Sequence, residues 1–215
     1  MRYDAAIFDL DGTLLDTIDD LKNSINHALS VCGYPPRTRA EVLAFVGNGV
    51  PRLVELAVPP GTPTDRRQAV LDAMNAHYAA HCAQLTRPYP GVTDVLRTLR
   101  AAGVRVAVVS NKPDYGVQEL CARYFPGLLD SAVGMREGIR KKPYPDAVEA
   151  ALAAFGVPPE RAVYIGDSEV DVQTAKNAHT ALISVDWGFR THAQLVEAGA
   201  EHIVSDADAL LTLLR

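Results

Sequence analysis

The stretch AAIFDLDGTL, residues 5–14, organises the rest of this 215-residue chain. Its first four residues are apolar and predict a short buried strand, and Gly12 gives the backbone the freedom for a sharp exit from the sheet. Side chains two positions apart on an extended chain face the same side, so we expect Asp9 and Asp11 to approach one site together. The alternative is a plain Asp-Gly turn at the end of the strand.

Two carboxylates this close repel each other, so a metal ion or a bound proton must offset one of the negative charges. Both solutions suit phosphate chemistry. A cation bridges a carboxylate to an anionic substrate, and a protonated carboxyl group donates its proton to a leaving oxygen. Asp9 and Asp11 are therefore the first candidate site residues.

The composition is typical of a globular protein, with 48% hydrophobic residues and a length that allows one large domain or two smaller ones. The formal net charge of -5 provides no general attraction for nucleic acid or an anionic membrane, so we expect neither as a partner. The chain has three cysteines, an odd number that cannot all pair in disulfides, and their spacing is not that of metal ligands. This indicates a protein of a reducing compartment. No stretch approaches the roughly 18 apolar residues of a membrane span, and no signal peptide is recognisable, so we expect a cytoplasmic protein.

Residues 16–87 carry helix signals and almost no strand signals. Asp16 or Thr17 can cap a first helix, and turn-forming residues at 33–36, 47–49 and 59–61 separate it from three further helices. The apolar residues of the first helix recur at spacings of three and four, at Ile18, Leu21, Ile25, Ala28 and Leu29. We interpret this segment as an inserted helical unit.

From Tyr89 onward, strand and helix patterns alternate. Strands are expected at 104–109, 131–133, 162–165, 180–185 and 202–204, with helices between them. Strands that are buried on both faces and joined by helices form a parallel sheet. The predicted fold class is therefore α/β, with a Rossmann-like parallel sheet core and helices on both faces. Residues 1–15 and 88–215 would form this core, and residues 16–87 the helical insertion.

Polar residues follow three of the best strand candidates. Asp9 and Asp11 follow the first strand, Ser110 and Asn111 follow the strand at 104–109, and the sequence GDSEVD at 166–171 follows a third. Ligands of open parallel sheets bind beyond the carboxyl ends of the strands. The three polar ends are therefore expected to converge on one site.

These signatures resemble those of the haloacid dehalogenase-like superfamily of phosphohydrolases. The chain carries DLDGT at 9–13, SN at 110–111, KPYP at 142–145 and GDS at 166–168 followed by Asp171. Each signature alone is weak, but their order and their positions at strand ends make the combination specific. The resemblance covers the whole chain and implies a Mg²⁺-dependent hydrolase of phosphate monoesters.

The resemblance implies that Asp9 is the nucleophile that attacks phosphorus and becomes an aspartyl phosphate. A carboxylate suits this role, because it forms an acyl phosphate that water can cleave. Asp11 would protonate the leaving alkoxide and later take a proton from the attacking water. Its backbone carbonyl would also join the metal site.

Mg²⁺ is the implied cofactor, and Asp9, Asp11, Asp167 and Asp171 are its candidate ligands. Asp167 would bind directly, since Mg²⁺ is a hard cation that prefers oxygen. Asp171 would act through a water molecule or support the direct ligands from behind. Capping of the following helix is the alternative for the last two residues, and it can coexist with metal binding.

The resemblance further implies that Thr13, Ser110 and Asn111 contact the transferring phosphoryl group. Lys142 would offset the negative charge of Asp9 and of the phosphoryl oxygens. Lys141 could take this role, but the family pattern places the working lysine directly before the proline.

The helical insertion matches the cap domain of one branch of the superfamily, which closes over the site and excludes water. Its loop VGNGV at 46–50 resembles a cap loop of phosphoglycolate phosphatases, in which Gly47 and Asn48 would present backbone N–H groups to an anion. Arg52 is a further candidate for binding a substrate carboxylate. The alternative for Gly-Asn-Gly is a simple helix stop. We expect a small phosphorylated metabolite as substrate, with 2-phosphoglycolate preferred, and a monomer or homodimer.

Nucleotidase, pyrophosphatase and sugar-phosphate mutase activities stay open as alternatives within the superfamily. Dehalogenation is disfavoured because Asp11 is present. Phosphonate cleavage is disfavoured because Lys22 is the only lysine in residues 16–87 and lies outside the cap loop. A binding module without turnover would carry a damaged signature, and all four are intact.

Overall fold

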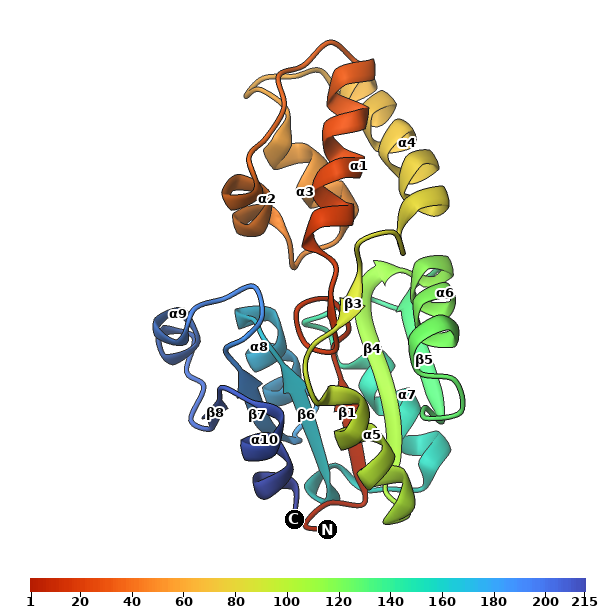
Figure 1. Ribbon diagram of the computed structural model, residues 1–215, viewed down its shortest axis with the longest axis vertical. Helices are drawn as coiled ribbons and strands as arrows, with labels where there is room; N and C mark the ends of the chain where they lie inside the picture. The colour runs from red at the N-terminus through yellow and green to blue at the C-terminus, as the bar shows by residue number, and fades with distance from the viewer. The chain divides into compact units, whose positions relative to one another are not determined.

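Six parallel strands form one sheet in the computed structural model, which describes residues 1–215 (Figure 1). Their order is β5, β4, β1, β6, β7, β8, so the first strand of the chain lies in the middle of the sheet. Every neighbouring pair is parallel, which confirms the expected α/β class. The strands are β1 (Ala5–Phe8), β4 (Arg105–Pro113), β5 (Ser131–Met135), β6 (Ala162–Gly166), β7 (Ala181–Val185) and β8 (Ile203–Val204).

Strand β1 pairs with β4 on one side and with β6 on the other over its whole length. Phe8, the last residue of β1, pairs with Val108 of β4 and with Ile165 of β6. All four residues of β1 are completely buried, as expected for a parallel sheet that is covered on both faces. Asp9 after β1, the β4 residues that follow Val108 and the residues after β6 therefore lie at neighbouring positions along one edge of the sheet.

Helices cover both faces of the sheet. Val148 and Leu152 of α7 share an apolar cluster with Ile7 and Tyr164 of the sheet and Ala175 of α8, and α5 and α10 lie on the opposite face (Figure 1). The helices are α5 (Val92–Ala101), α6 (Asp114–Tyr124), α7 (Asp146–Phe155), α8 (Glu169–Asn177), α9 (His192–Glu197) and α10 (Ala207–Leu214), with a short 3-10 helix at Pro159–Arg161.

Two strands run beyond their expected ends. β4 continues past Val109 to Pro113, and its pairing with β5 shifts between these two residues. β5 reaches Met135, which pairs with Pro113, and the preceding Gly134 N–H donates to the Asp114 carboxylate at 2.8 Å. A larger side chain at Gly134 would collide with the Asp114 backbone. Residues 110–112 are polar, so a pattern based on apolar runs ends the strand too early.

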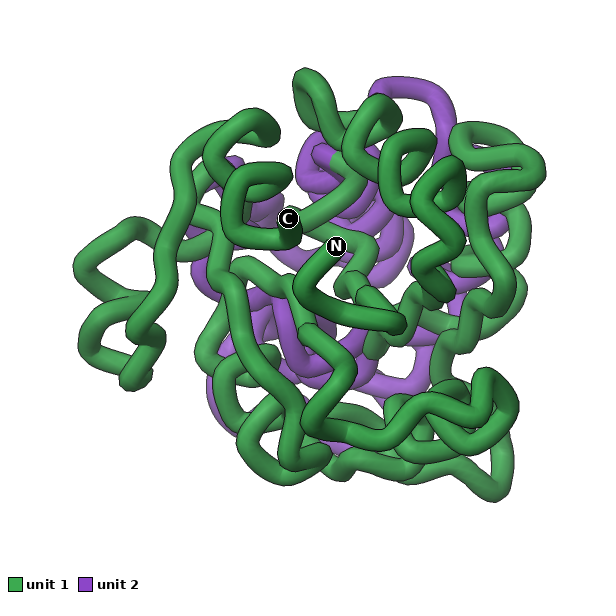
Figure 2. Tube along the Cα trace, turned by 90° about the horizontal axis from the view of Figure 1, so that it is seen from below, with its two compact units in different colours: residues 1–15, 88–215 green, residues 16–87 purple.

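Residues 16–87 form a second structural unit, which consists of four helices (Figure 2). They are α1 (Ile18–Val31), α2 (Arg39–Phe45), α3 (Val50–Ala57) and α4 (Thr64–His81). We call this segment the helical unit and call Met1–Leu15 with Pro88–Arg215 the α/β unit. Two short strands, β2 (Leu15–Asp16) and β3 (Arg87–Pro88), pair with each other where the chain passes between the units.

α1 and α4 form the core of the helical unit. All five apolar positions predicted for α1 are buried. α1 packs against α4, whose buried residues are Val70, Met74 and Tyr78. The buried Asp20 carboxylate accepts hydrogen bonds from the backbone N–H groups of Leu85 and Thr86, at 3.0 and 2.8 Å. None of the helices in either unit combines the length and the apolar character that a membrane crossing requires.

Candidate active site

Asp9 leaves the sheet directly after β1 and lies against a buried lysine. The Asp9 N–H still donates to the Ile165 carbonyl (2.9 Å), so the backbone is anchored at the strand end. Its carboxylate is nearly buried, and Oδ1 lies 2.8 Å from the Lys142 Nζ. Burial, assisted by the charges of Asp171 and Asp11 and opposed by Lys142, raises the pKa of Asp9 to about 7.

Lys142 connects two carboxylates in the interior. Its ammonium group lies 2.8 Å from both Asp9 Oδ1 and Asp171 Oδ1 and donates to the Tyr164 hydroxyl at 3.1 Å. Burial alone would lower the pKa of Lys142, but the charges of Asp171 and Asp9 outweigh it and raise the pKa well above its ordinary value. Lys142 is therefore a buried cation, whereas the neighbouring Lys141 is exposed.

Asp167 follows β6 and is 1% exposed, with no basic side chain in ion-pair distance. Its carboxylate accepts hydrogen bonds from the Thr13 hydroxyl (3.1 Å) and from the Phe189 N–H (2.7 Å). Burial, together with the charges of Asp171 and Asp9, raises the pKa of Asp167 well above its ordinary value. A buried carboxylate without a cationic partner is costly, so this position is suited to a bound cation.

Glycine is required where the loop after β1 passes Asp167. Gly12 has a φ of +87°, a conformation that other residues rarely adopt, and a Cβ atom there would collide with the Asp167 carboxylate. A Cβ atom at Gly188 would collide with the Gly12 carbonyl and with Asp167 as well. The two glycines let the loop after β1 and the segment after β7 both approach the Asp167 carboxylate.

Asp171 is completely buried at the start of α8 and is fully engaged by hydrogen bonds. Its Oδ2 accepts from the N–H groups of Asp167 and Ser168, at 3.2 and 3.1 Å, and from the Ser168 hydroxyl at 2.6 Å. Its Oδ1 accepts from Lys142 and from the Tyr164 hydroxyl. Helix capping and support of the buried lysine are thus combined in this one side chain.

The carboxylates of Asp9, Asp167 and Asp171 form a group that fits a metal ion. One oxygen of each lies within 4.8 Å of the others, and all three residues are buried. Only Lys142 offsets their charge, so the group keeps a negative excess that a divalent cation can neutralise. Oxygen donors suit a hard cation. Asp171 already accepts five hydrogen bonds, which leaves Asp9 and Asp167 as the residues best placed to bind it.

Asp11 lies outside this group and pairs with a lysine that the sequence reasoning missed. The Lys112 Nζ donates to both carboxylate oxygens of Asp11, at 2.7 and 3.1 Å, and the Lys112 side chain is 2% exposed. Its stem packs against Gly116 of α6, where a Cβ atom would meet the lysine at 3.3 Å. The available signal was a basic residue directly after Ser110 and Asn111, on a strand whose continuation was not recognised.

The residues expected to contact a phosphoryl group have partners of their own. Asn111 accepts from the Lys142 N–H (2.8 Å) and donates to the Lys142 carbonyl (3.1 Å), so its side chain positions the lysine backbone. The Ser110 hydroxyl accepts from the Lys112 N–H (3.3 Å). Thr13 binds Asp167, and its carbonyl accepts from the Trp187 indole N–H at 3.1 Å. Trp187 therefore joins the segment after β7 to the loop after β1.

The candidate substrate residues of the helical unit surround the loop between α2 and α3. Gly47 and Gly49 have φ values of +118° and +85°, which explains why this loop needs glycine on both sides of Asn48. Arg52, in the first turn of α3, donates to the Glu55 carboxylate at 2.6 Å. Thus Asp9, Lys142, Asp167 and Asp171 gather at one place in the α/β unit, and Gly47, Asn48 and Arg52 belong to the other unit.

Comparison with known proteins agrees with this geometry. Residues 6–185 match the family model of haloacid dehalogenase-like hydrolases. A phosphoglycolate phosphatase of Cereibacter sphaeroides is 38% identical over 215 residues, which covers 97% of this chain and 96% of the relative. Among solved structures, a candidate phosphoglycolate phosphatase from Lactobacillus delbrueckii subsp. bulgaricus has a TM-score of 0.95 and 39% identity, covering 100% of this chain and 99% of its own.

A more distant likeness is found with CbbY from Rhodobacter sphaeroides, a variant of which was solved in complex with xylulose-(1,5)bisphosphate. Its TM-score is 0.75 at 26% identity, and 94% of this chain and 93% of that chain are covered. The family match spans most of the chain, and the phosphatase relative spans nearly all of it. The chain therefore belongs to the haloacid dehalogenase-like hydrolases and is a phosphoric monoester hydrolase of the phosphoglycolate phosphatase-like branch.

Proposed function

We propose that this hydrolase cleaves small phosphate monoesters through an aspartyl phosphate on Asp9, with Mg²⁺ as cofactor and 2-phosphoglycolate as preferred substrate. The observation that carries the proposal is the buried cluster in which Asp9 lies 2.8 Å from Lys142 and within reach of Asp167. A nucleophile, a fixed cation and a metal-binding carboxylate meet there at the carboxyl end of a parallel sheet.

In the first step, an oxygen of Asp9 bonds to phosphorus while the bond from phosphorus to the leaving alkoxide breaks, and Asp11 gives that alkoxide a proton. In the second step, Asp11 takes a proton from water as the water oxygen attacks phosphorus. The bond between phosphorus and Asp9 then breaks, which releases inorganic phosphate, frees the Asp9 carboxylate and leaves Asp11 protonated as it was before the first step. Lys112 holds Asp11 through both of its oxygens, so we assign it the role of positioning this acid and base.

Asp9 and Asp167 would hold the Mg²⁺, with the Asp11 backbone carbonyl as a further donor. When bound, the ion supplies positive charge that brings the anionic substrate and the Asp9 carboxylate together. Lys142 contributes the same kind of charge from the protein itself. Asp171 and Asn111 keep that lysine in place, the first through its side chain and the second through its backbone. Thr13 orients Asp167.

We assign the α/β unit as the catalytic domain and the helical unit as a cap that reads the leaving group. The Gly47 to Gly49 loop is the part of the helical unit that is best suited to meet a substrate anion, because its glycines allow backbone N–H groups to turn outward. The names of the relatives support 2-phosphoglycolate. A sugar bisphosphate is the second candidate, since the CbbY variant binds one.

A panel of substrates tests this proposal. Phosphate release is compared for 2-phosphoglycolate, xylulose bisphosphate, β-glucose 1-phosphate, a nucleoside monophosphate and pyrophosphate, each with and without Mg²⁺. We expect 2-phosphoglycolate to have the highest kcat/KM and activity to require the ion. A higher kcat/KM for another monoester would refute the preferred substrate and leave the reaction class intact.

The mechanism needs a separate test. The substitution Asp9→Asn nearly conserves volume and removes the nucleophile, so we expect a folded protein with no measurable turnover and no transfer of label from phosphate ester to protein. Retention of turnover in a folded Asp9→Asn protein would contradict the mechanism. Circular dichroism and thermal unfolding check that the variant is folded.

A further inference from the structure

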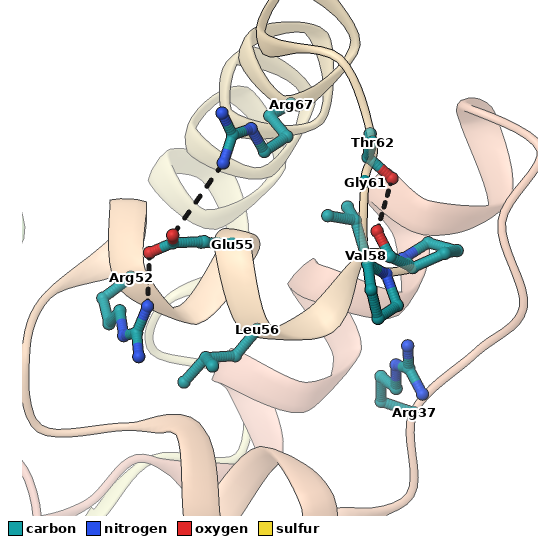
Figure 3. Close-up of a pocket in the computed structure, with 10 residues that line it drawn as sticks. Arg37, Arg52, Glu55, Leu56, Val58, Gly61, Thr62 and Arg67 are labelled. Atoms are coloured by element: carbon teal, nitrogen blue, oxygen red, sulfur yellow. Dashed lines mark hydrogen bonds and ion pairs between the residues drawn. The ribbon is translucent and has the colours of Figure 1, made fainter.

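A cavity of about 600 Å³ lies entirely within the helical unit (Figure 3). Its walls come from α3, from the loop between α3 and α4 and from the first turn of α4, with Arg37 contributed from the segment before α2. This volume is in the range of small-molecule sites in proteins. The lining residues are Arg37, Arg52, Glu55, Leu56, Val58, Pro59, Pro60, Gly61, Thr62 and Arg67.

The cavity concentrates positive charge. Three arginines and one glutamate line it, although residues 16–87 as a whole contain as many acidic as basic side chains. The arginines come from three different elements, so their guanidinium groups surround the cavity. An anion inside it would meet donors from several directions, which suits a group with several oxygen acceptors.

In the cavity, the negatively charged side chain of Glu55 lies beside two of the arginines. Its carboxylate lies between two guanidinium groups, 2.6 Å from Arg52 Nη1 and 3.8 Å from Arg67 Nη1 (Figure 3). The hydrogen bond from Arg52 holds the pKa of Glu55 below its ordinary value. Both arginines and the glutamate are partly exposed, so a ligand from solvent can compete with this carboxylate.

Arg37 is held firmly in place at the cavity wall. Its Nε donates to the Ala57 carbonyl (2.6 Å), and its Nη1 donates to the Glu41 carboxylate (3.1 Å). The Nη2 group makes no hydrogen bond in the structure. Leu56 and Val58 add an apolar surface beside these donors. The cavity thus offers both charge and an apolar wall to a ligand.

The cavity lies at the end of the helical unit that is remote from the connecting strands. α1 and α4 are antiparallel, because Asp20 contacts Thr86 near the connections while Arg66 donates to the Cys32 carbonyl (3.1 Å) at the opposite end. Arg67 is adjacent to Arg66. An α-helix rises about 1.5 Å per residue, so most of the 18-residue α4 separates Arg67 from β3.

We propose that this cavity is a second anion site, which binds the phosphate group of a small metabolite that also carries an apolar portion. The ligand displaces Glu55 from Arg52 and Arg67. A ligand carboxylate would only exchange one single negative charge for another, whereas a phosphate group brings a second charge and more acceptor oxygens. The site is distinct from the catalytic cluster, since no residue of the α/β unit lines it.

Arginine side-chain resonances provide a direct test. We titrate the ¹⁵N-arginine-labelled full chain, without divalent metal, with phenylphosphonate, a non-hydrolysable phosphate analogue that carries an apolar ring. At about pH 8 such a group carries two charges. We expect saturable shifts of the Arg52 and Arg67 Nε–Hε resonances. Benzoate, with the same ring and a single charge, should bind at least about tenfold more weakly, which corresponds to about 1.4 kcal/mol. Absence of saturation, or equal binding of benzoate, would overturn the proposal.

Matched variants sharpen the test. Arg67→Gln should weaken phenylphosphonate binding about tenfold, and Glu55→Gln should strengthen it severalfold because the internal competitor loses its charge. Arg66→Gln is the control, since it changes the net charge equally but does not line the cavity. Asp9→Asn should bind as the wild type does. Equal weakening by Arg66→Gln, or loss of the Arg52 and Arg67 shifts in Asp9→Asn, would count against a separate site.

Discussion

The two units both place basic side chains beside carboxylates, but they do so in different surroundings. In the α/β unit, Lys142 is 4% exposed and its partner Asp171 is completely buried. In the helical unit, Arg52 and Glu55 are each 47% exposed. Water screens the second pair, whereas the first must be satisfied inside the protein. Similar chemistry therefore gives a rigid, costly arrangement in one unit and an exchangeable one in the other.

Loss of the buried cation should have the largest effect. Lys142→Met leaves Asp9 and Asp171 buried without their partner, so we expect the free energy of unfolding to fall by about 3–5 kcal/mol and phosphatase turnover to be lost. Denaturant unfolding and phosphate release measure the two effects. Lys141→Met is the matched control, and the change for this exposed residue should stay within about 0.5 kcal/mol. Equal effects of the two substitutions would contradict the assignment.

Two glycines with similar backbone conformations allow the cost of a left-handed backbone to be measured separately from the cost of a side-chain collision. Gly12 and Gly33 have φ values of +87° and +77°, but only Gly12 faces a neighbouring group, the Asp167 carboxylate. Gly33→Ala should cost about 1–2 kcal/mol of unfolding free energy from the left-handed conformation alone. Gly12→Ala should cost at least about 1 kcal/mol more and reduce kcat, because Asp167 must move. Similar unfolding free energies for the two variants would show that the contact with Asp167 is unimportant.

Substitution of Lys112 tests whether this lysine positions Asp11, and it leaves the nucleophile Asp9 in place. Lys112→Met removes both hydrogen bonds that orient Asp11, and we expect kcat to fall about tenfold or more with a smaller change in KM. Lys176→Met, at an exposed position of α8, controls for the loss of one positive charge. A rise in KM with kcat unchanged would argue against a role of Lys112 in orienting the acid and base.

Asp130 represents an ion pair at the edge of the α/β unit. Burial alone would raise the pKa of Asp130, but hydrogen bonds from Arg100, from the Val106 N–H and from Arg105 outweigh it and hold the pKa below its ordinary value. The folded state therefore binds this proton less readily than the unfolded state. The stabilisation is present above the unfolded pKa and is lost as the pH falls through the folded pKa. Asp130→Asn should remove about 1 kcal/mol at neutral pH and flatten the acid limb of the stability curve. An unchanged acid limb would refute this account.

The exposed pair of the helical unit should have the smallest effect on stability. Arg52→Gln breaks the contact with Glu55, but solvent already screens that pair, so we expect no measurable change in the thermal midpoint of unfolding. Differential scanning calorimetry of the variant measures it. A clear loss of stability would mean that this pair resembles the buried pairs of the α/β unit, and the comparison of the two units would fail.

Much of the fold followed from local patterns. The apolar run before Asp9, the helix spacing from Ile18 to Leu29 and the alternation after Tyr89 each reflect a short-range preference that the chain carries in itself. The four signatures resemble those of the haloacid dehalogenase-like superfamily, and this resemblance predicted the site residues. The structure places Asp9, Lys142, Asp167 and Asp171 at one edge of the sheet, where β1 and β6 end beside each other.

Other features depend on residues that are distant in the chain. Lys112 lies 101 positions from Asp11, and the Phe189 N–H that binds Asp167 belongs to the segment after β7. Three histidines also come together, as His27 of α1 stacks on His77 of α4 at 4.2 Å and His77 stacks on His81 at 4.0 Å. No periodic pattern on α1 indicates that His77 of α4 will stack on His27.

The sequence by itself determined the fold class and the candidate chemistry, because strand patterns, helix patterns and each signature depend on residues that are close together in the chain. Only the tertiary structure decided the partners: Lys112 for Asp11, Asn111 for the Lys142 backbone, and three arginines around one cavity of the helical unit. The physical reason is that hydrogen bonds and ion pairs act over a few ångströms, so they depend on how the chain packs and not on how far apart their members lie in sequence.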